Sequence, residues 1–252
     1  MLFETLLIDK TDGIAVVTLN RPEKLNAVSL KMRSEILSLL EELREDDDVK
    51  VVIFTGAGSA FSAGADISEF KEGKDKLRAS QMPDKDITRH IYEFEKPVIG
   101  AINGVATGKG SQFTLAFDMN IASEDAKFGW GATLLGLLCP YGIIRLPKEI
   151  TRFRAKELMM TCRFLSAREA YEWGIVNKVV PKDKLMEAAM ELAAKIKEMP
   201  PLSIRAIKEA VNIGMGGYEY SRQVFANLQR TEDADEGARA FLEKRKPHFT
   251  GR

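Results

Sequence analysis

The chain has 252 residues, of which 45% are hydrophobic and 29% are charged, a composition typical of a globular protein long enough to bury a substantial core. Lysine and arginine together number 37, as do aspartate and glutamate, so the formal net charge is zero. Because nucleic-acid-binding domains usually carry a basic excess, this balance argues against a nucleic-acid partner. Two cysteines do not make a disulfide framework, and the two histidines belong to no Cys/His cluster, so no metal site is predicted.

The first residues carry acidic side chains early, at Glu4 and Asp9, and contain no long apolar run. A signal peptide or a transmembrane helix needs an uninterrupted apolar stretch, so neither is predicted here. We therefore expect a cytoplasmic protein with no membrane association.

The first part of the chain alternates between patterns typical of strands and of helices. A turn at residues 11–13 (TDG) precedes residues 14–19, which are rich in β-branched side chains and predict a strand. Ser29 is a suitable N-cap for an amphipathic helix that reaches Arg44. Residues 49–55 then have the composition of a buried strand.

The strand-then-helix order returns and then gives way to helices. Residues 97–102 and 117–122 are predicted strands on either side of a helix over residues 108–115. After about residue 150 we expect no further strands, and helices over residues 151–162, 167–173, 184–199, 203–214 and 218–244. The charged segment 69–85 is expected on the surface. The pattern predicts an α/β core followed by an α-helical C-terminal extension.

Two glycine-rich turns carry the chemical signal. The segments 61–67 (FSAGADI) and 103–112 (NGVATGKGSQ) each follow a predicted strand and open a helix, and neither has the spacing of a P-loop or of a dinucleotide-binding fingerprint. Small residues let the backbone approach a ligand closely, and amide N–H groups at a helix entrance can point at an anion. Two such turns could aim two amides at one oxygen, as in an oxyanion hole, although each turn alone is also compatible with a plain strand-to-helix loop.

Four phrases of the sequence resemble one family and occur in that family's order. They are residues 19–27 (LNRPEKLNA), 61–66 (FSAGAD), 96–104 (KPVIGAING) and 241–249 (FLEKRKPHF). Through these phrases, which span nearly the whole chain, the sequence resembles the crotonase superfamily of enoyl-CoA hydratases and isomerases.

The resemblance implies an α/β fold of the ClpP/crotonase type. A spiral of ββα units would occupy residues 1–195, and a C-terminal α-helical trimerisation region would occupy residues 196–252. The resemblance also implies a homotrimer or a dimer of trimers that acts on a small-molecule acyl-coenzyme A. Coenzyme A would be part of the substrate, with no permanently bound cofactor.

The resemblance also assigns site residues. The backbone N–H of Ala65 matches one oxyanion donor, and that of Lys109 matches the second, at a position that the family usually fills with glycine. A side chain is tolerated there only if the backbone conformation is accessible to residues other than glycine. The family's contacts to substrate and coenzyme A match Lys24, Ala27, Ala63, Ala65, Asp66, Ile67, Gln112 and Ala132. Of these, Lys24 is a candidate to neutralise a phosphate, and its alternative is a solvated surface lysine.

The sequence departs from the family's hydratases at both acid/base positions. Addition of water to a conjugated double bond uses two carboxylates, and the matching positions here are Gln112 and Ala132. An amide does not exchange protons usefully near neutral pH, and a methyl group cannot do so at all. Isomerisation or decarboxylation through the enolate is therefore favoured over hydration. Loss of CO₂ generates an enolate without a base, whereas isomerisation requires one, and the nearest carboxylates are Asp66, Glu69 and Glu149.

The loop 136–142 (GLLCPYG) supplies a candidate proton donor. Tyr141 lies in a Pro-Tyr phrase that resembles a tyrosine of some decarboxylating relatives, and it is the third catalytic candidate beside the two amides. The alternative is a packed tyrosine whose hydroxyl is satisfied elsewhere. Cys139 is expected to be a buried structural thiol, and His90 is either structural or directed toward the acyl pocket.

Other functions stay open on the sequence alone. The chain could be a 2-enoyl-CoA hydratase that uses other acid/base residues, or a non-catalytic acyl-CoA-binding paralogue. Some members of the superfamily bind RNA through a lysine-rich helix, but the lysines of residues 182–197 alternate with acidic residues, which is typical of a solvated face. Turnover of any acyl-CoA would distinguish an enzyme from a binding protein.

Overall fold

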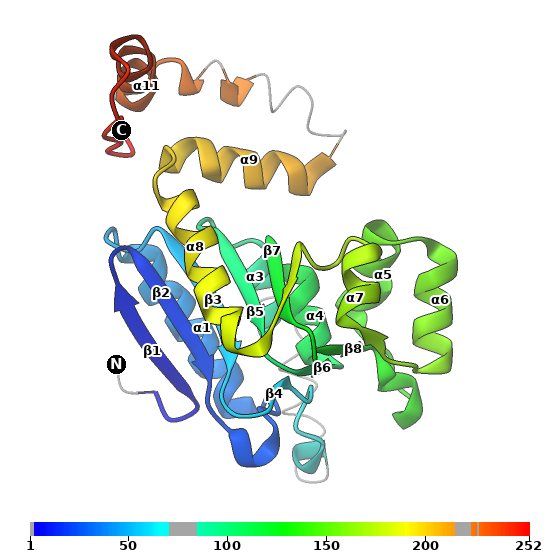
Figure 1. Ribbon diagram of the computed structural model, residues 1–252. Helices are drawn as coiled ribbons and strands as arrows, with labels where there is room; N and C mark the ends of the chain where they lie inside the picture. The colour runs from blue at the N-terminus through cyan, green and yellow to red at the C-terminus, as the bar shows by residue number, and fades with distance from the viewer. Residues whose placement is uncertain (1–2, 71–84, 215–222, 226) are drawn as a thin grey trace.

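The structure is a computed structural model that describes residues 3–70, 85–214, 223–225 and 227–252 (Figure 1). A six-stranded sheet has the order β1-β2-β3-β5-β7-β10. Its strands are β1 (Leu6–Thr11), β2 (Ile14–Leu19), β3 (Val51–Gly56), β5 (Val98–Ile102), β7 (Met119–Ser123) and β10 (Lys178–Val180). β1 and β2 form an antiparallel hairpin, and every other neighbouring pair is parallel.

A second, smaller sheet has the order β4-β6-β8-β9. Its strands are β4 (Ala60–Ser62), β6 (Val105–Thr107), β8 (Lys127–Gly129) and β9 (Leu165–Ser166). Three times in succession, a strand of the large sheet is followed directly by a strand of the small sheet: β3 by β4, β5 by β6, and β7 by β8. Within the small sheet, β4, β6 and β8 run parallel to one another. This repeated geometry confirms the expected spiral of ββα units.

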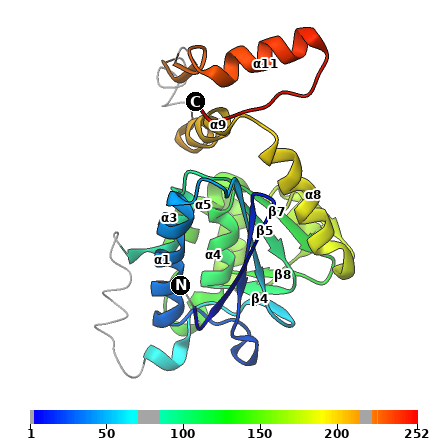
Figure 2. The same cartoon turned by 90° about the vertical axis from the view of Figure 1, so that its left-hand side faces the viewer.

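Helices cover both faces of the large sheet (Figures 1 and 2). On one face lie α1 (Leu30–Glu45), α3 (Ile87–Tyr92) and α4 (Lys109–Ala116), and on the other lies α8 (Leu185–Lys197), which packs against β3, β5 and β7. The predicted N-cap of α1 is confirmed, because the Ser29 hydroxyl accepts a hydrogen bond of 3.1 Å from the Met32 N–H.

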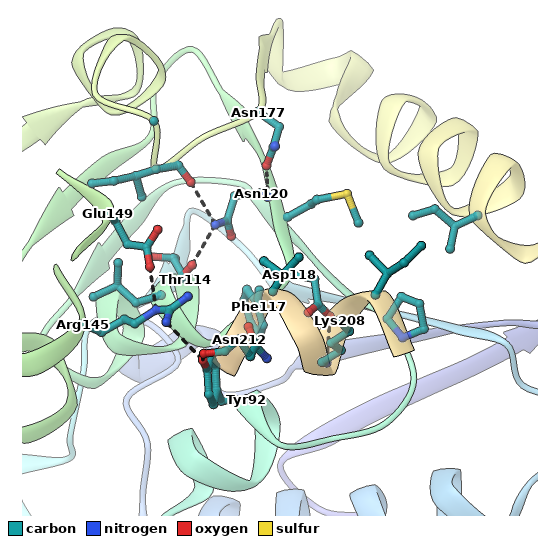
Figure 3. A pocket seen from close by; sticks show the side chains of 18 of the residues that line it. Tyr92, Thr114, Phe117, Asp118, Asn120, Arg145, Glu149, Asn177, Lys208 and Asn212 are labelled. Atoms are coloured by element: carbon teal, nitrogen blue, oxygen red, sulfur yellow. Dashed lines mark hydrogen bonds and ion pairs between the residues drawn. The ribbon is translucent and has the colours of Figure 1, made fainter. Parts of the chain in front are cut away.

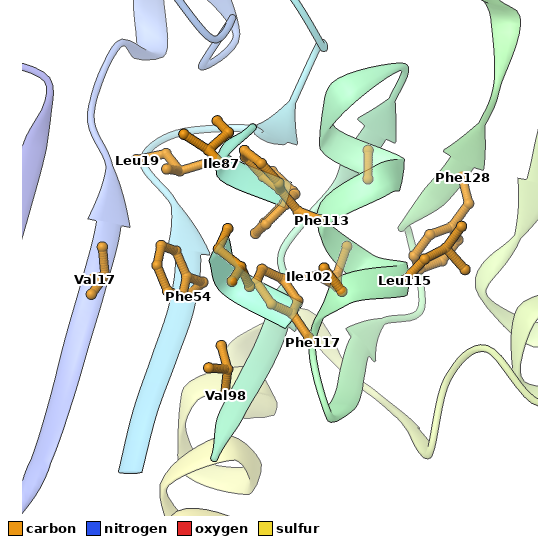
Figure 4. Close-up of a cluster of buried hydrophobic side chains, with 14 of the residues drawn as sticks. Val17, Leu19, Phe54, Ile87, Val98, Ile102, Phe113, Leu115, Phe117 and Phe128 are labelled. Atoms are coloured by element: carbon orange, nitrogen blue, oxygen red, sulfur yellow. The ribbon is translucent and has the colours of Figure 1, made fainter. Parts of the chain in front are cut away.

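Aromatic side chains fill the space between the large sheet and α4 (Figure 4). Phe54 of β3 stacks on Phe117 at a ring-centroid distance of 5.4 Å, and Phe61 meets the same ring edge-on at 6.1 Å. Phe113 of α4 is also fully buried in this cluster. These contacts fix α4 against β3 and β4, and therefore fix the two glycine turns that follow β4 and precede α4.

The remaining helices are α5 (Pro140–Glu149), α6 (Arg152–Thr161), α7 (Ala167–Glu172), α9 (Pro201–Ile213) and α11 (Glu232–Glu243). Short 3₁₀ turns occupy Pro22–Lys24, Ile67–Phe70, Gly131–Leu135 and Lys182–Lys184. Among the described residues, no helix is long and apolar enough to cross a membrane.

Three expectations need correction. Strands do not stop at residue 150, since β9 and β10 follow it, but each is too short to show a period-2 pattern. The loop 136–142 is partly helical, because Pro140 occupies the first turn of α5, where a missing N–H costs nothing. Within the range 218–244, where one continuous helix was expected, α11 starts after its N-cap residue Thr231. Part of that range lies outside the described residues, as does most of segment 69–85.

The C-terminal phrase holds its position through two carboxylates of α11. Glu236 accepts hydrogen bonds from Arg245 at 2.6 Å and from the His248 N–H at 2.9 Å, and Asp233 accepts one from the Thr250 N–H at 2.7 Å. The tail therefore folds back along α11 (Figure 2).

Candidate active site

The two glycine turns lie against each other. β4 and β6 are parallel neighbours, so the turns that follow them emerge side by side. Gly64 has φ +97°, and a Cβ atom added to it would lie 2.8 Å from the Thr107 carbonyl oxygen and 3.3 Å from the Lys109 nitrogen. Only a residue without a side chain permits this approach.

The N–H of Ala65 points away from the neighbouring segment at Val28. Val28 and Ala65 form an isolated parallel bridge, in which the Val28 N–H donates to the Gly64 carbonyl at 2.7 Å and the Asp66 N–H donates to the Val28 carbonyl at 3.2 Å. Successive amides of an extended segment point in opposite directions, so the Ala65 N–H faces the other side. No backbone acceptor among the described residues pairs with it.

Lys109 is the first residue of α4, and its N–H therefore has no acceptor within the helix. The positive backbone angle occurs one residue earlier, at Gly108 with φ +54°, and Lys109 is not among the residues with positive φ. The assignment of Lys109 as a backbone donor required a conformation that residues other than glycine can adopt, and position 109 has such a conformation.

Both amide-bearing residues line one cavity of about 710 Å³. Its polar lining residues are Arg33, Thr107, Lys109 and Gln112. Its small lining residues are Ala63, Gly64, Ala65, Gly108, Gly131 and Ala132. Its larger apolar lining residues are Ile67, Leu135, Leu137, Leu138, Cys139 and Pro140. The structure thus brings six of the predicted site residues together. Lys24, Ala27, Asp66 and Tyr141 are not part of this lining.

The two positions of the missing carboxylates belong to this cavity. Gln112 is 4% exposed, and its Oε1 accepts a hydrogen bond of 3.0 Å from the Tyr141 N–H. That bond fixes the amide orientation and leaves Nε2 as a donor without an acceptor among the described residues. Ala132 adds only a methyl group. No aspartate or glutamate occurs among the described residues that line the cavity.

The carboxylates beside the first glycine turn are engaged elsewhere. Asp66 pairs with Arg21 at 2.9 Å and accepts from the Ser68 hydroxyl at 2.6 Å. Burial would raise the pKa of Asp66, but the hydrogen bonds from Ser68 and Arg21 outweigh burial and lower this pKa. Both oxygens of Glu69 accept from the Leu30 N–H at the start of α1, at 3.1 and 2.9 Å.

Glu149 belongs to a second cavity, of about 370 Å³, between α4, α5 and α9 (Figure 3). It pairs with Arg145 at 2.5 Å, and in the same cavity Lys208 of α9 pairs with Asp118 at 2.8 Å. The charged groups therefore neutralise one another, and the Lys208–Asp118 pair attaches α9 to the core. We interpret this cavity as part of the packing between α9 and the core rather than as a binding site.

Tyr141 is half-buried beside the first cavity, and its hydroxyl oxygen is buried. Its ring meets the Tyr92 ring at a centroid distance of 5.9 Å, and its hydroxyl has no hydrogen-bond partner among the described residues. Burial raises the pKa of the Tyr141 hydroxyl, so it stays protonated. Cys139 is buried and free, as expected, and His90 of α3 is not part of the cavity lining.

Three charged side chains near the cavity were not predicted. Arg33 of α1 is 3% exposed, and Lys109 is 5% exposed with its Nζ 2.8 Å from an oxygen of Asp86. Burial lowers the pKa of Lys109, although Asp86 opposes that effect. One signal was available, because Arg33 lies three residues before Ile36 on the apolar face of α1. No cluster of three or more potential metal ligands occurs in the described part of the chain.

The family model for enoyl-CoA hydratase/isomerase matches residues 9–252. A short-chain-enoyl-CoA hydratase of Clostridium acetobutylicum is 37% identical, covering 98% of this chain and 97% of the relative. A carnitinyl-CoA dehydratase of Salmonella typhi is 36% identical, covering 99% of both chains. The crystal structure of an enoyl-CoA hydratase from Bacillus anthracis superposes with a TM-score of 0.94 at 36% identity, covering 99% of this chain and 100% of the other. The chain therefore belongs to the enoyl-CoA hydratase/isomerase family, within the crotonase superfamily.

The close approach of the two turns makes a specific prediction. Gly64→Ala should lower the affinity for butyryl-CoA at least about 10-fold, because the new Cβ separates the turns that carry the two amides. Gly174→Ala is the matched control, since Gly174 has φ +89° and its nearest neighbour, the Glu149 carbonyl oxygen, is 3.9 Å away.

Calorimetry should then show unchanged affinity in Gly174→Ala, with stability lower by about 1–2 kcal/mol from the left-handed backbone alone. Equal affinities in Gly64→Ala and the wild type would contradict this account of the turns.

Proposed function

We propose that the chain catalyses an enolate-forming reaction of an acyl-CoA thioester other than hydration, and that decarboxylation of a β-carboxy thioester fits the site best. One observation supports the proposal: the cavity is lined by Ala65 and Lys109, whose N–H groups have no backbone acceptor among the described residues, and by an amide and a methyl group at the two acid/base positions. A site of this kind can stabilise negative charge on an oxygen but has no carboxylate with which to activate water.

The proposed reaction begins with the thioester carbonyl accepting hydrogen bonds from the N–H groups of Ala65 and Lys109. The bond between the α carbon and the carboxylate then breaks, CO₂ leaves, and the electron pair forms the enolate, whose oxygen carries the negative charge. The two amides stabilise this charge more than they stabilise the neutral carbonyl, and that difference lowers the barrier. A proton delivered to the α carbon completes the reaction.

Isomerisation of a double bond is the second candidate, and the contacts of the nearest carboxylates argue against it. It requires a base that removes an α proton. Asp66 is bound by Arg21, Glu69 caps α1, and Glu149 pairs with Arg145 in the other cavity. Decarboxylation needs no such base.

For the proton donor we propose Tyr141. Its hydroxyl is protonated and unpartnered, and its backbone N–H is bonded to Gln112, which lines the cavity. Because the Tyr141 side chain is not part of the lining, the proposal requires the ring to turn from Tyr92 toward the substrate.

The remaining contacts and the assembly are proposals that rest on the family. Lys24 is exposed and would neutralise a phosphate of coenzyme A, with Ala27, Ala63, Asp66 and Ile67 nearby along the nucleotide. Residues 196–252 would form the oligomerisation region of a trimer or a dimer of trimers. Large apolar side chains that are exposed on α9 and α11 support this role: Ile207, Val211, Phe241 and Leu242.

Turnover of a mixed panel tests the proposal. Crotonyl-CoA, a 3-enoyl-CoA and methylmalonyl-CoA are incubated with the protein, and products are followed by mass spectrometry. We expect loss of CO₂ from methylmalonyl-CoA with no appreciable hydration of crotonyl-CoA. Fast hydration would show that other residues supply the acid and the base, and binding without any turnover would indicate a non-catalytic acyl-CoA-binding protein.

Restoring both carboxylates should restore hydration. The double variant Gln112→Glu/Ala132→Glu should hydrate crotonyl-CoA about 100-fold faster than the wild type, because it regains a positioned acid and base. Gln112→Glu/Ala132→Gln is the control, since it has nearly the same side-chain volume and lacks one acid. Equal hydration rates in the two double variants would mean that these positions do not decide the reaction.

Tyr141→Phe isolates the proposed proton donor. We expect turnover of methylmalonyl-CoA to fall about 100-fold while the affinity for butyryl-CoA is retained, since only a hydroxyl without a protein partner is removed. Tyr92→Phe is the matched control on the facing ring. Unchanged turnover in Tyr141→Phe would remove this residue from the mechanism.

A further inference from the structure

Arg33 is a buried cation with unused hydrogen-bonding capacity. It lies on the inner face of α1 and is 3% exposed, among the buried residues Met32 and Ile36 of the same helix. Its Nε and Nη1 atoms have no hydrogen-bond partner among the described residues. Burying a charge without a partner is costly, so such a group is expected to meet an anion when the protein is at work.

The carboxylates nearest to Arg33 do not neutralise it. Asp86 is bound by Lys109 Nζ at 2.8 Å and by the Thr88 N–H at 3.2 Å. Both oxygens of Glu69 accept the Leu30 N–H. Two buried cations, Arg33 and Lys109, therefore share one close carboxylate, and that carboxylate is paired with Lys109. Among the described residues, no carboxylate is hydrogen-bonded to Nε or Nη1 of Arg33.

The second cavity provides a comparison within the same protein. There the largely buried Lys208 ammonium has a direct partner in Asp118, which also accepts from the Val98 N–H at 2.7 Å (Figure 3). The Lys208 ammonium is thus paired directly, whereas Nε and Nη1 of Arg33 have no hydrogen-bond partner among the described residues.

Arg33 also lines the cavity that contains the amides of Ala65 and Lys109. Because its Nε and Nη1 atoms are shielded from solvent, the guanidinium has to turn toward that cavity to meet an anion there. Another part of the lining is apolar and comes from Leu135, Leu137 and Leu138. The cavity therefore combines a cation without a hydrogen-bonded carboxylate among the described residues with apolar surface for an acyl chain.

We propose that Arg33 binds a carboxylate on the acyl group of the substrate, so that the chain prefers carboxylated acyl-CoA thioesters over purely apolar ones. The proposal rests on the acyl-CoA function proposed above and specifies its substrate class. A guanidinium pairs strongly with a carboxylate, which has several acceptor sites for its N–H donors. An apolar acyl chain would leave the charge unpaired, and a carnitinyl group, which carries a quaternary ammonium, would be repelled.

The effect of Arg33 is expected in binding more than in bond cleavage. In a decarboxylation, negative charge leaves the carboxylate in the transition state and moves toward the thioester oxygen. An ion pair with the scissile carboxylate would therefore stabilise the bound substrate at least as much as the transition state. Removing Arg33 should raise KM for methylmalonyl-CoA while kcat stays equal or increases.

The test compares carboxylated and apolar ligands on the wild type and on variants of α1. Calorimetry measures the affinities for glutaryl-CoA and hexanoyl-CoA in the wild type, Arg33→Gln and Lys31→Gln. Lys31 is the matched control on the same helix, because its side chain is 53% exposed and pairs with Glu4. We expect the wild type to prefer glutaryl-CoA, Arg33→Gln to lose about 10-fold or more for that ligand alone, and Lys31→Gln to match the wild type.

The outcomes separate the two proposals. If neither thioester binds to the wild type, the acyl-CoA function itself fails. If hexanoyl-CoA binds as well as or better than glutaryl-CoA in the wild type, the carboxylate site is wrong while the acyl-CoA function stands. Thermal unfolding of Arg33→Met adds an independent readout, since removing an unpaired buried cation should not lower stability, and a large loss would show that Arg33 is paired within the fold.

Discussion

The close approach of two backbone turns is the constraint on which the site depends. Gly64 lies so near Thr107 and Lys109 that a single added carbon would collide with the Thr107 carbonyl. The approach follows from the parallel pairing of β4 with β6 and from the aromatic packing that seats α4 against the large sheet. The proposed oxyanion hole is thus built from main-chain atoms held by the core.

The charges of the side chains around the two turns determine which reaction we propose for the site. Gln112 and Ala132 remove the two carboxylates that hydration needs, and the remaining acids near the turns are held by Arg21 and by the N-terminus of α1. Arg33 instead gives the cavity a cation. Among the described residues, this pocket is lined by no carboxylate, and two nitrogens of its guanidinium lack a partner, which suits a substrate that brings its own negative charge.

The sequence predicted the backbone turns of the site better than the charged side chains around them. Ser29, the β-branched run 14–19 and the two glycine turns are local signals. Ala65 and Lys109, which the family resemblance assigned, line one cavity in the structure. Arg33 and the Lys109–Asp86 pair could not be assigned in the same way. Their partners depend on which helices meet, and Asp86 and Lys109 are 23 positions apart. The strands β9 and β10 were missed because two or three residues carry no periodic signal.

The proposed oxyanion hole requires the amides of Ala65 and Lys109 to hold the thioester oxygen together. A crystal structure of the protein with butyryl-CoA, which has no reactive carboxylate or double bond, would test this arrangement. We expect the thioester oxygen at about 3 Å from both amide nitrogens, within hydrogen-bond distance. An oxygen more than about 4 Å from both nitrogens would contradict the oxyanion hole, and with it the enolate chemistry proposed for this cavity.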